Sequence, residues 1–419
     1  MLKLSFIRSW VLTRFSKRTL ALLILLISLA IRLVYASLAE QVDPILRRAP
    51  LYGDGSGYHL LALNLLKGWG LTWDGLVPTS IRMPGYPVFI ALVYYLTEPD
   101  PIYVRLAQAL IGSLTCIPVM AVARKLGGNL AAVLAGIGVA FHPLIIYLTG
   151  WIYSETVFLP LVWIGVWLLV ESLSDGKRLR AVLGGLCIGL AAYMRPEIIF
   201  FPAATVVGTW VLLRWPKERI VQLLIAGVTA AALVLPWTIR NAVVHQTFVP
   251  LTTNTGGLLF GGNNPAATGG WHFDVPFILP GYTEVASDQE YTRRAVEWVR
   301  ENPADFLALL PRKLVRFFSP AEMLSSGSVL GRATLPVNLV YACFLLLAAW
   351  GGRQAWSRDP ASTAVILGLI GWYVIIALVL YGGSRIALGI VPGVIIFAAI
   401  GLETLLDNAS RGPAQDSLI

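Results

Sequence analysis

Long apolar runs occupy most of this chain, and they constrain its fold more than any other feature. A helix needs about 20 apolar residues to cross a bilayer. Runs near that length lie at 20–39, 103–123, 128–148, 156–173, 180–195, 197–213, 219–237, 333–350, 361–381 and 386–406. Charged residues make up only 13% of the 419 residues, against about 25% in a soluble domain. We expect an all-α polytopic membrane protein with a bundle of about ten transmembrane helices.

The positions of Lys and Arg predict the orientation. One short apolar stretch, 84–97, begins Pro-Gly-Tyr-Pro and decides the topology. If it does not cross, every short basic loop lies on one side, as cytoplasmic loops do; if it crosses, four consecutive loops break that rule. We therefore expect a re-entrant or interfacial segment here. Both termini are then cytoplasmic, in an integral protein of the plasma (inner) membrane.

The net charge of +9 does not indicate nucleic acid, because the basic residues lie in short gaps between apolar runs. Cys116, Cys187 and Cys343 lie inside apolar runs, without the spacing of a metal site or a disulfide framework. Arg32 and Arg105 fit the pattern of residues near span ends that extend to the headgroups. A cleavable signal peptide ending near Ala39 is the alternative to a first span.

Three regions follow from this topology. Residues 1–239 form an N-terminal transmembrane catalytic module with a first outer loop at 40–102, which contains an amphipathic helix at 57–69. Residues 240–331 form an extracytoplasmic segment, and residues 332–419 form C-terminal transmembrane helices with a short cytoplasmic tail. No internal repeat is visible, which weakens the interpretation as a transporter.

Polar and ionisable residues gather at the predicted outer ends of the spans. They are Asp54, His59, Arg82, Glu155, Arg195, Glu197, Arg240, Asn241 and Arg385. Each has a structural alternative: Asp54 lies between glycines and suits a turn, and Glu155 begins a span and suits a helix cap. Together, however, they predict an outward-facing cavity with carboxylates and arginines. Guanidinium groups bind phosphate, and a carboxylate can accept the proton of an attacking hydroxyl or amine. The pattern thus favours group transfer from a phosphate-linked donor.

The order of several motifs resembles a known family. After the first span come Asp54 with Tyr58, then Asn64-Leu65-Leu66-Lys67-Gly68, then Arg82-Met83-Pro84-Gly85-Tyr86-Pro87. Ser154-Glu155-Thr156-Val157-Phe158, Met194-Arg195-Pro196, Pro236-Trp237-Thr238-Ile239-Arg240-Asn241, Gly262-Asn263-Asn264-Pro265 and Arg385 before Pro392 follow in sequence. Between about residues 50 and 400, this order resembles that of GT-C class glycosyltransferases of the dolichyl-phosphate-mannose protein mannosyltransferase type, including the aminoarabinose transferases of lipid A.

The resemblance implies an inverting glycosyltransferase with a polyprenyl-phosphate-sugar donor and a lipid, glycan or protein acceptor on the extracytoplasmic face. It implies catalytic roles for Asp54, as general base, and Glu155. It implies that Arg82, Arg240 and Arg385 bind the donor phosphate. The expected substrate-binding residues are Tyr58, His59, Lys67, Tyr86, Arg195, Asn241, Asn263 and Asn264.

Some relatives bind a divalent ion and others need none, and this chain lacks a dense cluster of carboxylates and histidines, so no metal ligand is assigned and a divalent metal stays open. Three alternatives to the glycosyltransferase stay open as well: a polymerase that uses a lipid-linked glycan, a transporter or flippase for lipid or sugar, and a membrane scaffold.

Overall fold

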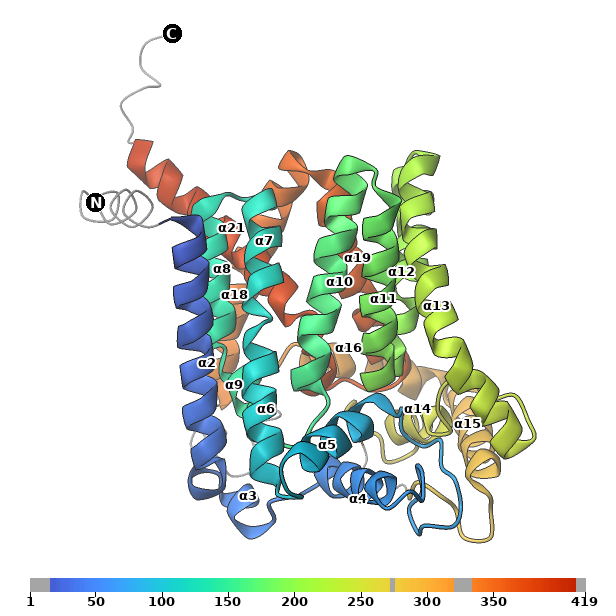
Figure 1. Ribbon diagram of the computed structural model, residues 1–419. Helices are drawn as coiled ribbons and strands as arrows, with labels where there is room; N and C mark the ends of the chain where they lie inside the picture. The colour runs from blue at the N-terminus through green and yellow to red at the C-terminus, as the bar shows by residue number, and fades with distance from the viewer. Residues whose placement is uncertain (1–15, 272–275, 320–333, 412–419) are drawn as a thin grey trace.

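The computed structural model describes residues 16–271, 276–319 and 334–411. These residues form helices and no strand, apart from one isolated bridge between Thr72 and Pro78. Long helices stand side by side in a bundle, and shorter helices lie across its lower end (Figure 1). α2 (Lys17–Val42) begins, and α21 (Val391–Arg411) ends, at the opposite, upper end. The predicted basic N-terminus before residue 16, the end of the 240–331 segment and most of the cytoplasmic tail lie outside the described residues.

The bundle contains the helices that the apolar runs predicted. Besides α2 and α21 they are α6 (Pro101–Ser113), α7 (Cys116–Leu126), α8 (Asn129–Phe141), α9 (Pro143–Thr149), α10 (Glu155–Asp175), α11 (Arg178–Met194), η1 (Pro196–Phe200), α12 (Phe201–Leu213), α13 (Lys217–His245), α18 (Thr334–Arg358) and α19 (Pro360–Val379). Among the described residues, seven helices are long and apolar enough to cross a membrane, with α6 and α7 taken as one, and α8 with α9 raises the number to eight. Because α11 has 17 residues and α12 has 13, the total of ten stays a prediction.

A bend of 46° separates α8 from α9. Pro143 begins α9, and it has no N–H to donate to the carbonyl of Val139, four residues back. Arg32 replaces that donor: its guanidinium bonds the carbonyl oxygens of Val139 (3.3 Å) and Ala140 (3.4 Å). Arg32 is therefore fully buried and does not extend to the headgroups as predicted. Arg105 is also buried, and it binds Glu40 at 2.5 Å.

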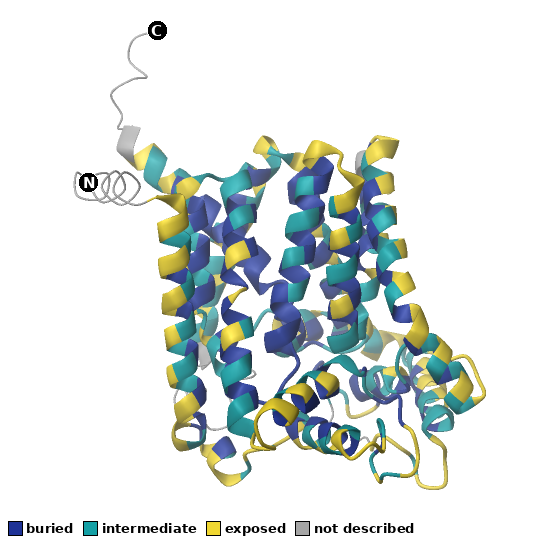
Figure 2. Cartoon of the chain, viewed as in Figure 1, coloured by how far each residue is buried: buried dark blue, intermediate teal, exposed yellow. Residues whose placement is uncertain are grey.

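Helix α10 lies at the centre of the bundle. Buried positions surround it on every side, whereas α2 and α13 expose one face each (Figure 2). Trp163 in α10 has no exposed surface, and its indole donates to the carbonyl of Gly389 (3.2 Å). The first residue of α10, Glu155, is therefore fixed by a rigid helix.

The first outer loop carries α3 (Pro44–Arg48), α4 (Asp54–Leu66) and α5 (Gly85–Leu96). Helix α5 has 12 residues, about 18 Å of helix, and lies beside α4 across the lower end of the bundle rather than through it (Figure 1). The amphipathic helix begins at Asp54, three residues before its predicted start at Gly57. Gly53 precedes it with φ +67°, and a Cβ there would meet the Tyr153 hydroxyl at 2.8 Å, so only glycine fits this position.

Residues 240–331, the second outer segment of the predicted topology, contain three helices in their described part besides the end of α13. They are α14 (Thr255–Gly262), α15 (Glu284–Glu301) and α16 (Pro303–Phe317). The sequence of residues 288–318 has helical periodicity throughout, but the structure divides it between α15 and α16 at Asn302 and Pro303. The short helix α20 (Ser384–Ala387) returns the chain to the same end of the bundle before α21 begins.

Candidate functional site

A half-open cavity of about 530 Å³ lies at the end of the bundle that carries α4 and α5. Its walls come from the first outer loop, the start of α10, the α11–η1 junction, the second outer segment and α20. The lining residues are Tyr52, Gly53, Asp54, Tyr58, Ile81, Arg82, Met83, Tyr153, Ser154, Met194, Arg195, Pro196, Glu197, Thr252, Asn254, Leu258, Trp271, Phe277, Tyr381, Arg385 and Ile386.

Asp54 holds two arginines in this cavity. Its Oδ1 accepts from Nη2 of Arg82 (2.5 Å), and its Oδ2 accepts from Nη1 of Arg385 (2.5 Å). The carboxylate lies in the first turn of α4, where the helix dipole also favours its charged form. Burial alone would raise the pKa of Asp54, but the two guanidinium groups outweigh burial and hold that pKa well below its usual value. Asp54 is thus ionised and a weak base in this state.

Arg385 connects Asp54 to Glu155. Its Nε and Nη2 (3.2 Å) bind the two carboxylate oxygens of Glu155 as a fork, and its guanidinium lies 4.0 Å from the ring centroid of Tyr153. Arg195 binds Glu155 from the other side and also donates to Glu197 (2.6 Å). Arg195 can reach both because Pro196 ends α11, which leaves Arg195 in an extended conformation.

The six side chains form one alternating row: Arg82, Asp54, Arg385, Glu155, Arg195 and Glu197. Three positive and three negative charges balance, which makes their burial tolerable. Exposure falls from 30% of the Arg385 side chain to 1% of that of Glu155. Asp54 and Arg385 therefore face the cavity, while Glu155 is buried behind them and binds Arg385.

Aromatic rings fix the arginines further. The guanidinium of Arg82 lies 4.6 Å from the ring centroid of Tyr58 and 5.5 Å from that of Phe277. Such cation–π contacts hold the cation without using its N–H donors. The sequence did not single out Tyr153, Trp271, Phe277 or Tyr381, although Tyr153 lies only two residues before Glu155.

In addition to Tyr58, the structure thus brings together six of the residues named from sequence: Asp54, Arg82, Glu155, Arg195, Glu197 and Arg385. Tyr86 is buried one layer behind, with its ring edge against Tyr58 and its hydroxyl on Gln108. His59 bonds the Tyr94 hydroxyl (2.8 Å), and Lys67 lies over Trp69 at the end of α4. None of these last three lines the cavity.

Arg240 and Asn241 are placed elsewhere. Arg240 donates to Thr79 O (3.0 Å) and Ser80 Oγ (2.7 Å), and Asn241 accepts from Ser80 Oγ (2.8 Å). Both therefore support the segment before Arg82 from behind. They do not line the cavity, because α13 continues to His245 and turns this face toward the first outer loop.

Asn263 and Asn264 also point away from the cavity. Asn263 accepts from Lys313 Nζ (2.7 Å) and donates to Val379 O (2.9 Å), which joins α16 to α19. Asn264 bonds the backbone of its own turn. Lys313 is fully buried, and burial lowers the pKa of its ammonium group to about 8. Sequence analysis did not single out that lysine.

The donor set was also tested for a metal ion. Within residues 16–271, 276–319 and 334–411, no three or more His, Cys, Asp or Glu side chains are placed to hold one. At the cavity, Asp54 and Glu155 both bind Arg385 through their carboxylates. A divalent ion would have to take oxygens that arginine already occupies. This set of residues does not fit a metal ion.

Comparison with known proteins now gives a context for this geometry. The profile of the dolichyl-phosphate-mannose-protein mannosyltransferase family matches residues 81–239. That segment includes Arg82, Glu155 and Arg195. A search of the curated proteins returned no match.

Solved structures show the fold. The oligosaccharyltransferase of Archaeoglobus fulgidus in the apo form matches with a TM-score of 0.60 and 13% identity, over 96% of this chain and 51% of that one. The oligosaccharyltransferase AglB from Archaeoglobus fulgidus, in complex with an inhibitory peptide and a dolichol-phosphate, matches with a TM-score of 0.56 and 13% identity, over 94% of this chain and 51% of that one. The present chain thus spans about half the length of these proteins.

A weaker similarity, with a TM-score of 0.46 and 13% identity over 93% of this chain and 78% of that one, is to ArnT from Cupriavidus metallidurans bound to undecaprenyl phosphate. That score adds nothing to the fold assignment. The helical bundle, its apolar spans and the stronger matches agree: this chain is a membrane protein with the fold of the GT-C class glycosyltransferases, and its residues 81–239 match the dolichyl-phosphate-mannose-protein mannosyltransferase family.

Proposed function

We propose that this protein is an inverting glycosyltransferase that moves a sugar from a polyprenyl-phosphate donor to a lipid, glycan or protein acceptor. The observation that carries the proposal is the bridge of Arg385 between Asp54 and Glu155 in a half-open cavity beside the first outer loop. The complex of the similar AglB with a dolichol-phosphate supports a lipid-phosphate donor.

The donor phosphate exchanges partners with Asp54. Arg82 and Arg385 each bind Asp54 through one terminal nitrogen, and a phosphodiester offers them the same charge with more acceptor oxygens. Glu155 keeps Arg385 in place through the fork during this exchange. The arginines then stabilise the charge that develops on the departing polyprenyl phosphate.

The exchange also prepares Asp54 for its part in the reaction. Once the phosphate takes the two guanidinium groups, the charges that depress the pKa of Asp54 are compensated, and the pKa rises. Asp54 then accepts the proton of the acceptor hydroxyl or amine as that group attacks the anomeric carbon. Attack from the side opposite the phosphate breaks the sugar–phosphate bond and inverts the anomeric configuration.

The cavity faces the extracytoplasmic side in this proposal, and both termini are cytoplasmic. The basic ends of the helices support this orientation. Arg124 and Lys125 end α7, Arg178 and Arg180 begin α11, and Arg358 ends α18. All of these ends lie at the end of the bundle opposite to α4 and α5 (Figure 1), as the positive-inside rule requires of cytoplasmic ends.

The test is transfer by the purified full-length protein in phospholipid nanodiscs. It is incubated with a panel of radiolabelled polyprenyl-phosphate sugars and membrane lipids. We expect one donor to be consumed by the wild-type protein, and its consumption to fall by about 100-fold or more in Asp54→Asn. Movement of labelled donor across a bilayer without any covalent product would support the transporter instead and would contradict the proposal.

A further inference from the structure

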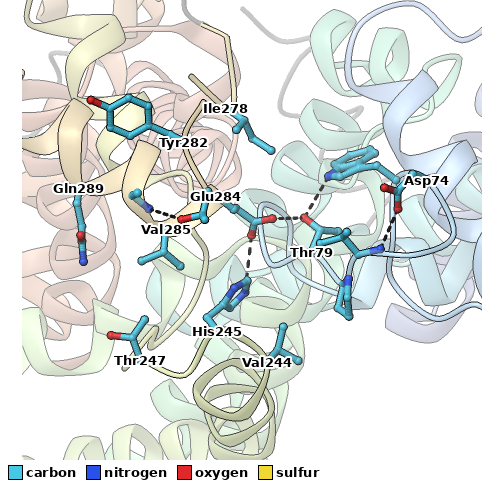
Figure 3. A pocket seen from close by; sticks show the side chains of 15 residues that line it. Asp74, Thr79, Val244, His245, Thr247, Ile278, Tyr282, Glu284, Val285 and Gln289 are labelled. Atoms are coloured by element: carbon cyan, nitrogen blue, oxygen red, sulfur yellow. Dashed lines mark hydrogen bonds and ion pairs between the residues drawn. The ribbon is translucent and has the colours of Figure 1, made fainter. Parts of the chain in front are cut away.

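A second cavity, of about 780 Å³, opens beside the first on the same side of the molecule. Three segments far apart in sequence build it: the loop between α4 and α5, the end of α13, and the start of α15 with the residues before it (Figure 3). The lining residues are Trp73, Asp74, Val77, Pro78, Thr79, Val244, His245, Thr247, Ile278, Tyr282, Thr283, Glu284, Val285, Ala286 and Gln289.

The two cavities share a wall. Residues 79–82 run between them, with Thr79 facing the second cavity and Arg82 the first. Likewise, Phe277 lines the first cavity and its neighbour Ile278 lines the second. Only this segment of backbone therefore separates a molecule in the second cavity from Arg82, which binds Asp54.

Glu284 makes this wall rigid. It accepts from Thr79 Oγ1 (2.8 Å), from the backbone N–H of Ser80 (2.7 Å) and from Thr253 Oγ1. In Figure 3 its carboxylate lies between Thr79 and His245, and the His245 Nε2 is 3.9 Å away. Both carboxylate oxygens of Glu284 thus already have donors.

The chemistry of the second cavity differs from that of the first. None of the described residues that line it is Lys or Arg, so a phosphate would find carboxylates and no guanidinium. An ammonium ligand would compete with three uncharged donors at Glu284 and with the N–H groups of Leu76 and Val77 at Oδ1 of Asp74. What remains is a set of hydroxyl, amide and ring groups, from Thr247, Gln289 and Tyr282 among others.

Two rings add flat apolar surfaces. The indole N–H of Trp73 donates to Thr79 Oγ1 (3.1 Å), which fixes the ring, and Tyr282 is 47% exposed. Aromatic faces with a few hydrogen-bonding groups suit an uncharged ligand with one apolar and one polar side. A sugar ring has this character, and the cavity has the volume of an ordinary ligand site.

We propose that this second cavity binds a neutral sugar unit of the acceptor. The inference rests on the proposed transferase function, and it adds that the acceptor is a glycan or a glycolipid rather than a protein or an anionic lipid. The acceptor's reactive hydroxyl would pass the end of the wall to reach Asp54, while the donor phosphate stays with Arg82 and Arg385.

The experiment measures binding to the full-length protein in nanodiscs, because sugar-based detergents would compete. Saturation-transfer NMR is recorded with three neutral trisaccharides (cellotriose, maltotriose and mannotriose), each also as an alkyl glycoside. Trigalacturonic acid and the glucosamine trimer are the anionic and cationic counterparts. We expect at least one neutral trisaccharide to bind, and the charged trimers to fail to displace it. Stronger binding of the alkyl glycoside would indicate a glycolipid, and equal binding a free glycan.

Variants locate the binding. Ala286→Trp and Thr247→Trp fill the cavity from two different elements and should each weaken binding at least tenfold. Val296→Trp, on the exposed side of the same helix α15 and outside the cavity, is the matched control and should bind as the wild type does. Failure of every neutral trisaccharide to bind, equal binding in all variants, or tighter binding of a charged trimer would overturn the inference.

Donor consumption separates this inference from the function on which it rests. If the protein consumes a polyprenyl-phosphate sugar but binds no neutral glycan, the second cavity has been misassigned and the transferase stands. If glycan binds and is lost in Ala286→Trp while no donor is consumed, the site stands as a glycan site and the transferase falls.

Discussion

The two cavities share a wall but differ in the charged residues that line them. In the first, three arginines alternate with three carboxylates, and Arg385 belongs to two ion pairs. In the second, the described lining residues include no Lys or Arg, and Glu284 is saturated by uncharged donors. Paired charges can be exchanged for a charged ligand, whereas a satisfied carboxylate serves only to hold structure. The difference assigns the donor phosphate to the first cavity and leaves the second for an uncharged partner.

Replacing the carboxylate that gives up its arginines is expected to have the largest effect. Asp54→Asn keeps the shape of the side chain but cannot accept a proton, so sugar transfer should fall by about 10²–10⁴-fold. Binding of polyprenyl phosphate should persist in this variant, because Arg82 and Arg385 are no longer neutralised. Transfer assays and lipid-phosphate binding on the same preparation measure both. Loss of phosphate binding together with transfer would contradict the exchange.

Arg385→Ala removes the residue that both carboxylates share. Transfer should fall by about 10²–10³-fold, the usual effect of losing one donor that stabilises developing charge. Arg385→Lys keeps the charge but not the fork on Glu155, so it should recover only part of the activity. Initial rates at saturating donor measure this. Full activity in the lysine variant would show that the fork is unimportant.

Substitutions of Arg82, which lies in the first cavity, and of Arg240, which supports the shared wall, should affect phosphate binding differently. Arg82→Ala should weaken binding of polyprenyl phosphate at least tenfold, since Arg82 contacts Asp54 directly. Arg240→Ala removes bonds to Thr79, Ser80 and Asn241 and a contact with the Trp237 ring, none of which lies in the first cavity. It should therefore leave that binding within about threefold, since each neutral bond contributes about 1 kcal/mol. Titration of both variants with polyprenyl phosphate tests the pair. An equal loss in the two would restore Arg240 as a donor-phosphate ligand.

The pH dependence of transfer should report the exchange as well. In the free protein the arginines hold the pKa of Asp54 low, so kcat/KM should stay constant until the pH falls below the ordinary range of an Asp. In the donor complex the phosphate takes the arginines and the pKa of Asp54 rises, so kcat should begin to fall at a higher pH. Pre-steady-state and steady-state measurements over a pH series give the pH at which kcat/KM falls and the pH at which kcat falls. If both fall at the same pH, the donor does not release Asp54 from the arginines.

Glu284→Gln should have the smallest effect on transfer. The amide keeps one acceptor but leaves at least one donor among Thr79, Ser80 and Thr253 without a partner, which costs about 1–3 kcal/mol. Thermal stability should therefore fall, while transfer at saturating substrates stays within a few-fold. A collapse of transfer in a stable Glu284→Gln protein would mean that this carboxylate takes part in the reaction.

The apolar runs and the basic loops were sufficient to predict the helical membrane bundle and to predict that α5 does not pass through it (Figure 1). They also predicted that Asp54, Arg82, Glu155, Arg195 and Arg385 lie together, because each is close to one end of a helix and the bundle brings such ends together. The direction of a side chain around its helix was not predictable in this way. Arg240 lies five residues before the end of α13, and only the packing against residues 79–80 shows that it faces the wall.

Side chains that hydrogen-bond to backbone groups could not be recognised from the sequence either. Asn263 and Asn264 look like a polar loop, yet they satisfy turns and helix ends at the junction with α16 and α19. Arg32 resembles a span-end anchor, but it supplies the donor that Pro143 lacks. The second cavity combines three segments with no local motif in any of them, so nothing in the sequence indicated it.

In the proposed mechanism, Arg82 and Arg385 leave the Asp54 carboxylate for the donor phosphate, and one binding measurement tests this exchange directly. Polyprenyl phosphate is titrated into the wild-type protein, Asp54→Asn and Arg385→Ala in nanodiscs at neutral pH. The exchange predicts the tightest binding in Asp54→Asn, intermediate binding in the wild type and the weakest in Arg385→Ala. Equal affinity in all three proteins would show that the phosphate does not enter this cavity.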